Sequence, residues 1–256
     1  MITGLVEHRL LVNYRADADV VQRLLPSPFR PQLVTGRAVV GICILRLRGL
    51  RPDGVPERLG LVTDNAAHRF AVEWDGDDGP QTGVYIERRD TQNVLTVLAG
   101  GRLFPGVHHA ARFDVAASTD GLHIAMRSRD HQRTVDVDVA VVDQLVGSEL
   151  FGSTRDASTF FESGSIGWSP GRRDGDLQGV ELCTNAWRLQ PVDVRALFSS
   201  YFGDSERFPA GSIDLDCALL MRNVPVTWRR VPRIRRDDGG RVRTRRLHHR
   251  VSAGTD

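Results

Sequence analysis

Alternating and continuous runs of hydrophobic residues extend through most of the chain and predict a protein built mainly of β-strands. In residues 134–142, valines occupy every second position and alternate mostly with aspartates, a pattern typical of an antiparallel strand with one buried face. Residues 36–48 have a nearly continuous apolar centre, which indicates burial on both faces. Further strands are predicted at residues 6–15, 65–74, 82–88, 109–117, 122–129, 179–189 and 212–224.

Short helices are predicted where a capping residue precedes apolar residues at helical spacing. These segments are residues 17–25, 90–98 and 156–161, and residues 192–202 are expected to form a helix or a turn. There is no internal repeat and no Gly/Ser linker before about residue 229. We therefore expect one β-dominated α+β domain over residues 1–228, with mostly antiparallel strands and a few short helices.

The charge is distributed unevenly between this domain and the end of the chain. Residues 1–228 hold 24 arginines against 29 acidic residues, and residues 229–256 hold 10 arginines against 3. Such a basic tail can bind nucleic acid or anionic lipid by releasing counterions. It has no aromatic residue after Trp228 to stack on bases, however. We therefore favour a disordered, solubilising tail and do not expect nucleic acid as the main partner.

All 34 basic residues are arginines and the chain contains no lysine. Chemistry that forms a Schiff base on a lysine side chain is therefore excluded. The three cysteines are far apart, so we expect them to be reduced and buried rather than paired in disulfides or bound to zinc. Closely spaced histidine pairs of the metal-binding type and nucleotide-binding glycine motifs are absent, and we predict neither a metal nor a cofactor.

The sequence carries no signal for a membrane or for export. No apolar run reaches the roughly 18 residues that a transmembrane helix needs, and the first residues do not resemble a signal peptide. We therefore expect a cytoplasmic protein without a membrane partner. Monomer and homo-oligomer both remain open.

Several motifs resemble acetoacetate decarboxylase and its relatives in their order and spacing. A predicted strand ends in Tyr14-Arg15-Ala16-Asp17, and a helix closing on Leu-Leu-Pro-Ser-Pro-Phe (residues 24–29) and a long apolar strand follow. The corresponding stretch of the family reads Tyr-Arg-Thr-Asp, then a helix, then Val-Pro-Glu-Pro-Leu. Residues 83–90 and 101–105 continue the similarity, which covers residues 5–228. The chain looks closer still to the uncharacterised decarboxylase-like branch of the superfamily.

This resemblance implies a strongly curved antiparallel sheet that closes as a cone or barrel around an internal pocket. In the decarboxylase, a Tyr-Pro-Lys-Lys segment supplies the Schiff-base lysine and a second lysine that lowers its pKa. Here the matching segment is Phe104-Pro105-Gly106-Val107, so Gly106 and Val107 stand at the two lysine positions. The resemblance therefore implies a pocket for a small carboxylate, keto acid or β-dicarbonyl compound, without decarboxylation through an imine.

The two histidines that follow this segment are candidates for proton transfer. Histidine titrates near neutral pH, so His108 or His109 could act as general acid or base. Neighbouring residues of a strand point to opposite faces, so at most one of the two faces the pocket. The alternative is a surface or hydrogen-bonded histidine without a catalytic role.

Two further candidate groups lie on the predicted hairpin. Arg69 and Glu73 share a strand face with small alanines, and the guanidinium could clamp a carboxylate with two hydrogen bonds. With strict alternation, Tyr85, Glu87 and Arg89 share a face, which would give a polar site with one carboxylate for proton transfer. The alternatives are an Arg–Glu pair on a solvated sheet and a rim of ion pairs.

Arg102, just before the matching segment, could line the mouth of the same pocket, although a surface position is the alternative. The leading hypothesis is a lysine-free decarboxylase-like protein whose arginines hold a small organic acid or keto compound. Glu87 or His108 would then move a proton in a lyase-, isomerase- or cyclase-type reaction. The alternatives are a non-catalytic protein that binds a small molecule, and a nucleic-acid-associated protein that uses its basic tail.

Overall fold

The computed structural model describes residues 1–76, 79–93, 97, 104–171, 175–236 and 242–244. Its strands are β1 (Ile2–Ala16), β2 (Arg30–Pro31), β3 (Leu33–Val34), β4 (Arg37–Pro52), β5 (Leu61–Gly76), β6 (Gly79–Thr91), β7 (His108–Ala117), β8 (Gly121–Ser128), β9 (Thr134–Val141), β10 (Ile166–Pro170), β11 (Asp176–Cys183), β12 (Gln190–Ser199), β13 (Ile213–Arg236) and β14 (Val242–Thr244). Its helices are α1 (Ala18–Leu24), α3 (Thr154–Ser163) and the short 3-10 helix η1 (Glu57–Leu59).

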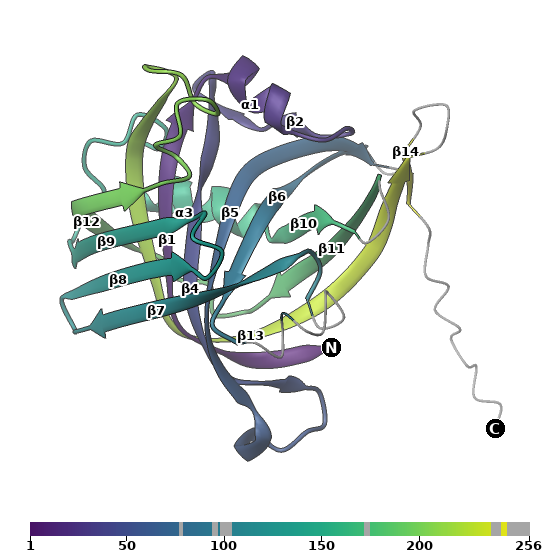
Figure 1. Cartoon of the computed structure of the whole chain (residues 1–256), viewed down its shortest axis with the longest axis vertical. Helices are drawn as coiled ribbons and strands as arrows, with labels where there is room; N and C mark the ends of the chain where they lie inside the picture. The colour runs from purple at the N-terminus through teal and green to yellow at the C-terminus, as the bar shows by residue number, and fades with distance from the viewer. Residues whose placement is uncertain (77–78, 94–96, 98–103, 172–174, 237–241, 245–256) are drawn as a thin grey trace.

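The strands form one sheet that closes into two rings, and the rings share a wall (Figure 1). The shared wall consists of β13, β1, β4, β5 and β6, in that order. The nine-strand ring closes from β6 through β7, β8, β9 and β12 back to β13, and the seven-strand ring closes from β6 through β10 and β11. This closed, cone-like sheet confirms the predicted fold class.

The sheet is mixed rather than purely antiparallel, because β6 has two parallel neighbours. One half of its outer edge pairs with β10 and the other half pairs with β7. Residues 92–107 connect β6 to β7, which is long enough for the crossover that parallel neighbours require. The ends of β6 and β7 therefore lie side by side where the two rings meet.

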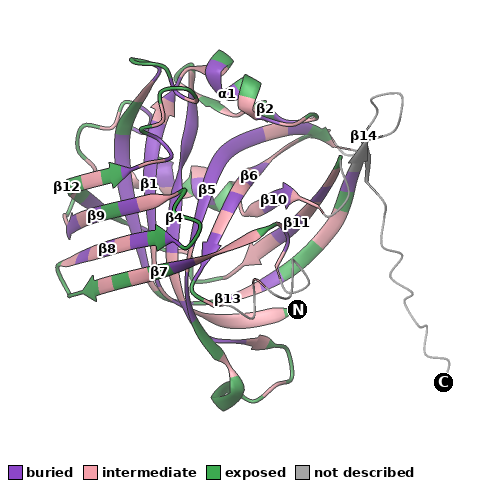
Figure 2. Ribbon diagram, viewed as in Figure 1, coloured by how far each residue is buried: buried purple, intermediate pink, exposed green. Residues whose placement is uncertain are grey.

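The shared wall is buried on both faces and divides the hydrophobic interior into two cores (Figure 2). Val40 and Ile42 of β4 face the first core, which fills the nine-strand ring together with apolar residues of β8 and β9. Val39 and Cys43 face the second core, which also contains Phe161 of α3. The burial on both faces that was predicted for residues 36–48 is confirmed.

The predicted helices at residues 17–25 and 156–161 correspond to α1 and α3. The segment 192–202 was predicted wrongly, because its first eight residues belong to β12, whose Val192–Ser199 portion pairs with β9. In the predicted helix 90–98, Asp90 and Thr91 complete β6, and most of the remainder lies outside the described residues. Within the described segments, no helix is long and apolar enough to cross a membrane.

Strand β13 continues into the segment that was expected to be a disordered tail. β13 extends to Arg236, and residues 229–235 pair with β11. Ile234 is buried in the first core, which gives this stretch an apolar anchor. The basic segment is therefore strand at its beginning, whereas residues 237–241 and 245–256 lie outside the described part.

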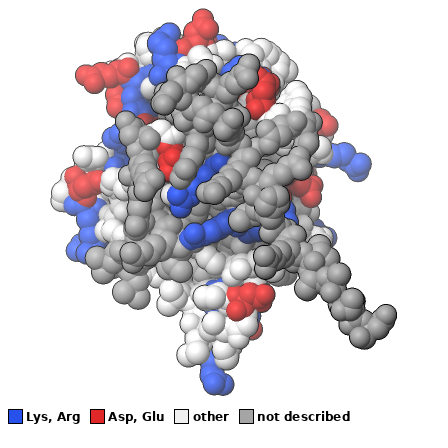
Figure 3. All heavy atoms as spheres, turned by 90° about the vertical axis from the view of Figure 1, so that its right-hand side faces the viewer, with Lys and Arg blue, Asp and Glu red and all other residues white. Residues whose placement is uncertain are grey.

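On the face shown in Figure 3, arginine side chains gather near the middle and acidic ones lie mostly toward the rim.

Candidate functional site

A β-bulge at Glu87 decides which side chains of β6 lie together. His68 of β5 pairs with Arg88 and the next residue, Arg69, pairs with Ile86, so Glu87 is the extra residue. The bulge reverses the alternation of faces along the strand. Tyr85 faces the first core, whereas Arg89 lies on the face of the second core, so the expectation that Tyr85, Glu87 and Arg89 share a face was wrong.

The guanidinium of Arg89 lies against β10 with part of its hydrogen-bonding capacity unused. Its Nε donates to Ser169 Oγ at 3.2 Å, and its buried Nη2 has no partner in the described structure. Gly106 has a φ of +96°, and a Cβ built there would lie 2.8 Å from Ser169 Cβ and 3.4 Å from Arg89 Nε. Only glycine fits this position well. Gly106, which the resemblance sets at a lysine position of the decarboxylase, therefore lies close to Arg89.

His108 is the direct neighbour of Arg89 across the parallel β6–β7 pairing. Its Nδ1 is buried and has no hydrogen-bond partner among the described residues. Burial, together with the positive charge of Arg89, lowers the pKa of His108 from 6.5 to about 3. At neutral pH the imidazole is therefore uncharged.

Arg89 and His108 border a cavity of about 80 Å³, which we call the candidate cavity. Its walls come from β4, β5, β6, β11 and β13, all of which belong to the seven-strand ring, from the first residue of β7 and from the segment before β7. Most of the wall is apolar, with leucines of β4 together with Phe104, Val180 and Trp228. An apolar cavity with a few polar groups on one side is the usual form of a small-molecule site.

Arg69 lies beyond the candidate cavity on the same face of β5. Its side chain is buried and donates through Nη2 to Asn13 Oδ1, and its guanidinium carbon lies 4.8 Å from the ring centre of Phe161. The Nε and Nη1 atoms have no partner in the described structure. Burial lowers the pKa of Arg69 from 12.5 to about 10, and the same cause lowers the pKa of Arg89 to about 10.

Arg9 of β1 is the third arginine on this face. Its Nε donates to Cys43 Sγ at 3.2 Å, and its guanidinium lies over Trp187 at 5.4 Å from the ring centre. Among the described residues, none of Arg9, Arg69 and Arg89 forms an ion pair with an acidic side chain. Asp90 also lines the candidate cavity, and it pairs with Arg88. The charge of Arg89 is therefore left without an acidic partner among the described residues, which suits an anionic ligand.

Glu87 lies on the other side of the wall, in a cluster of polar groups next to the first core. It accepts hydrogen bonds from Tyr201 and Arg207, and Arg207 Nη2 also donates to Tyr201 Oη at 3.0 Å. His68 stacks on the ring of Tyr201, with 4.3 Å between ring centres. The role of Glu87 in proton transfer remains a prediction, and the structure brings it together with Arg207 rather than with Arg89.

The remaining predicted residues are spread over the molecule. Glu73 lies at the outer edge of the sheet and pairs with Arg30 at 3.3 Å, not with Arg69. Tyr85 packs against Phe29 in the first core, with 5.8 Å between ring centres. Arg102 lies outside the described residues. Arg9 and Cys43 were not among the predicted site residues, because nothing in the local pattern of β1 or β4 distinguishes them.

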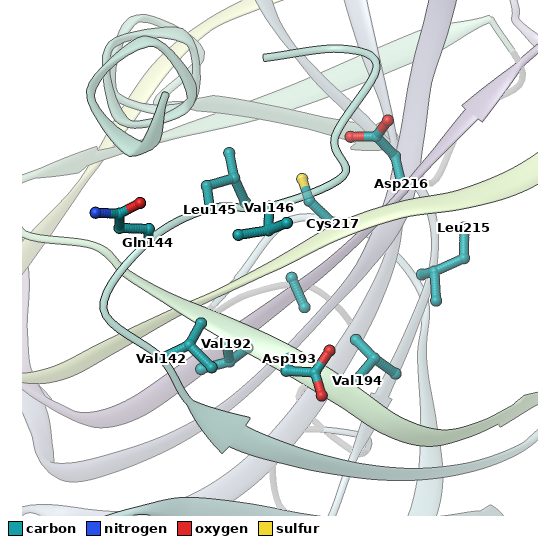
Figure 4. Close-up of a pocket in the computed structure, with 11 residues that line it drawn as sticks. Val142, Gln144, Leu145, Val146, Val192, Asp193, Val194, Leu215, Asp216 and Cys217 are labelled. Carbon is teal, nitrogen blue, oxygen red and sulfur yellow. The ribbon is translucent and has the colours of Figure 1, made fainter. Parts of the chain in front are cut away.

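A separate pocket of about 360 Å³ opens between β12 and β13 (Figure 4). Valines and leucines line it, together with Asp193, Asp216 and Cys217. Asp216 is already bound, because it accepts hydrogen bonds from Ser148 Oγ at 2.5 Å and from the backbone N of Glu149 at 2.8 Å. The described residues that line this pocket include no arginine, so it suits an anionic ligand less well than the candidate cavity. Among the described residues, no three His, Cys, Asp or Glu side chains cluster in a way that could hold a metal ion.

Comparison with known proteins places the chain in a family and in a fold. The model of DUF2071, described as "Uncharacterized conserved protein", matches residues 5–205. No curated protein matches the chain.

Solved structures with a similar fold include an acetoacetate decarboxylase, an acetoacetate decarboxylase-like enzyme and a biosynthesis enzyme. An acetoacetate decarboxylase-like enzyme from Sphingomonas wittichii RW1 is 12% identical, with a TM-score of 0.57 and coverage of 90% of this chain and 92% of that one. Acetoacetate decarboxylase from Legionella pneumophila is 13% identical, with a TM-score of 0.54 and coverage of 88% and 86%. The enduracididine biosynthesis enzyme MppR, complexed with pyruvate, is 10% identical, with a TM-score of 0.55 and coverage of 90% and 88%. At such identities the similarity shows the fold alone.

Proposed function

This chain belongs to the DUF2071 family and has the acetoacetate decarboxylase-like fold, and from this premise we propose that it binds a small 2-oxo acid in the candidate cavity and moves a proton on it. Arg89 would hold the carboxylate, and His108 would act as the general base. Because the chain has no lysine, the chemistry is enolisation without a Schiff base.

The observation that carries this proposal is the unpaired guanidinium at the wall of a mostly apolar cavity. Arg89 has a buried, unpartnered Nη2 and no acidic partner among the described residues. A buried cation without a partner is costly, whereas a charge-assisted hydrogen bond to a carboxylate is strong. A bound carboxylate would therefore supply the missing acceptor and the missing charge.

His108 is placed beside the group that would hold the substrate and is uncharged at neutral pH. A carboxylate bound at Arg89 would offset the positive charge that helps to lower the pKa of His108, which would make the imidazole a stronger base. In the proposed step, Nδ1 of His108 takes a proton from the carbon next to the keto group. The electrons of the C–H bond form the enolate, and Arg89 stabilises the negative charge on its oxygen. The carboxylate and keto oxygens of a 2-oxo acid lie on adjacent carbons, so one guanidinium can serve both.

The test is a pair of measurements with pyruvate as the probe. Pyruvate should raise the melting temperature of the native protein by mass action, and the protein should exchange the methyl protons of pyruvate for deuterium in D2O, followed by NMR. Arg89→Gln should lose both effects, and His108→Asn should keep binding and lose exchange. His109→Asn is the matched control, because His109 pairs with Asp130 at 3.1 Å, and it should keep both.

The outcomes separate the alternatives. If Arg89→Gln responds to pyruvate like the native protein, the site is assigned wrongly. If pyruvate binds at Arg89 but no proton exchanges, the protein is a non-catalytic binding module. If exchange depends on Glu87 rather than on His108, the proton passes through the cluster with Tyr201 and Arg207.

A further inference from the structure

The candidate cavity extends along β4 and β5 from a polar end at Arg89 to an apolar end. The row of Arg89 continues across the wall to Ala67 of β5 and Cys43 of β4. Leu45 and Leu47 follow Cys43 at steps of two residues, so both face the second core. Two residues of a strand span about 7 Å, so Leu47 lies about 14 Å along β4 from the row of Arg89. Because the cavity borders Arg89, Leu45 and Leu47, a ligand bound at Arg89 has apolar side chains beside its other end.

Two polar side chains that line the cavity away from Arg89 already have partners within the protein. Asn65 Nδ2 donates to the backbone O of Thr63 at 3.2 Å, and Thr63 Oγ1 lies 3.4 Å from Thr91 Oγ1. Among the described residues that line the cavity, the buried side-chain atoms without a hydrogen-bond partner are Arg89 Nη2 and His108 Nδ1. The unused buried hydrogen-bonding atoms of this lining therefore lie at one end only.

Large apolar side chains close the apolar end of the cavity. Trp228 of β13 lies in one row with Ile2 and Pro52, two residues beyond Leu50. It packs edge-on against Phe104, with 5.6 Å between the ring centres, and both Leu50 and Trp228 are buried. A polar group placed here would lose its water without gaining a partner, whereas an alkyl group gains free energy by leaving water. This end of the cavity therefore favours an alkyl group.

The volume of the cavity limits the length of that alkyl group. A water-sized group needs about 10–15 Å³ of cavity, so a cavity of about 80 Å³ accommodates about five to eight of them. Pyruvate has six non-hydrogen atoms, and 2-oxopentanoate has eight because its side chain contains two more methylene groups. An alkyl side chain of two or three carbons therefore fills the cavity best.

We propose that the ligand is a 2-oxo acid with a short alkyl side chain, whose carboxylate binds at Arg89 and whose chain extends toward Leu47 and Trp228. This inference rests on the proposed function, because it assigns the substrate class of the same site.

The experiment compares three probes on the native protein by isothermal titration calorimetry. The probes are pyruvate, 2-oxopentanoate and 4-hydroxy-2-oxobutanoate, which has a hydroxyl group in place of the terminal methyl group of 2-oxopentanoate. Each buried methylene contributes a factor of about four, so 2-oxopentanoate should bind about fifteenfold more tightly than pyruvate. The hydroxyl analogue should bind at least about tenfold more weakly than 2-oxopentanoate, because its hydroxyl group is buried without a partner.

A variant tests where the alkyl chain lies. Leu47→Ala removes three carbons from the apolar end, so 2-oxoheptanoate, which is too long for the native cavity, should gain at least about fourfold in affinity relative to 2-oxopentanoate. Leu189→Ala is the matched control, because Leu189 is buried in the same core and is not among the residues that line the cavity. It should keep the native ratio of the two affinities.

The outcomes separate this inference from the proposed function. If the native protein binds 2-oxopentanoate no more tightly than pyruvate or the hydroxyl analogue, the apolar end is assigned wrongly and the proposed function stands. Binding of none of the probes would overturn both. If the ratio changes as much in Leu189→Ala as in Leu47→Ala, the chain does not lie along this cavity. The comparison of probes needs no variant, so it decides the substrate class even if Leu47→Ala fails to fold.

Discussion

Replacing Arg69 with methionine should stabilise the ligand-free protein, although it removes a buried arginine that forms a hydrogen bond to Asn13. The Arg69 side chain is 2% exposed and lacks an acidic partner among the described residues. Its burial lowers the pKa from 12.5 to about 10. One pKa unit corresponds to about 1.4 kcal/mol, so keeping this group charged in the folded state costs about 3 kcal/mol at neutral pH.

Two losses offset part of this gain. The variant loses the hydrogen bond to Asn13, worth about 1 kcal/mol. It also loses the contact of the guanidinium with the ring of Phe161, again worth about 1 kcal/mol. Methionine keeps the length of the aliphatic stem and can itself pack against the aromatic ring. The net gain should be about 1 kcal/mol, which raises the melting temperature of a protein of this size by about 2–4 °C.

The assay is equilibrium urea unfolding of the ligand-free protein at neutral pH, with a thermal melt as a second readout. Arg48→Met is the control for the general effect of replacing an arginine, because Arg48 is exposed and pairs with Glu7 at 2.8 Å. It should change stability by less than about 0.5 kcal/mol. A loss of about 2 kcal/mol or more in Arg69→Met would refute the reasoning. It would mean that the folded protein itself compensates the charge of Arg69, and that no ligand is needed to do so.

Three further predictions follow from the same structure. Lowering the pH from 7 to 5 should lower the free energy of unfolding by about 2 kcal/mol through His68. The pKa of His68 is about 3 in the folded protein and 6.5 in the unfolded chain, so the unfolded chain takes up the proton first. Urea unfolding at the two pH values should show a smaller loss in His68→Gln. Glu87→Gln should lower the free energy of unfolding by about 1–3 kcal/mol through its contacts with Tyr201 and Arg207, and a pyruvate titration should show unchanged binding. Gly106→Ala should lower the melting temperature and weaken the pyruvate response, because a side chain at φ +96° is strained and meets Ser169.

The pattern of hydrophobic residues predicted those strands in which burial follows a regular order along the chain, either at every second residue or at every residue. The alternation in residues 134–142 and the continuous apolar centre of residues 36–48 correspond to β9 and β4. Residues 192–202 were misread because the alternation there is interrupted. β12 has a bulge between Val194 and Ala196 in its pairing with β9, so the apolar residues do not keep to one face.

The same limitation applies to the candidate site. Arg69, Arg89 and His108 were among the predicted residues, and the structure places all three on the side of the second core. Glu87 was grouped with Arg89 on the basis of strict alternation, and the bulge places it with Tyr201 instead. A bulge depends on how two strands pair. The pattern of hydrophobic residues within one strand therefore does not show where a bulge lies.

The sequence by itself determined the chemical limits of this protein and its secondary-structure class. The absence of lysine excludes a lysine Schiff base, and hydrophobic periodicity is a local property, so the β-rich architecture could be predicted. Only the tertiary structure decided that Arg9, Arg69 and Arg89 lie on the same side of the shared wall without an acidic partner among the described residues. The reason is that these residues come from three strands that are distant in sequence, and ring closure and register, which depend on the whole chain, bring them together.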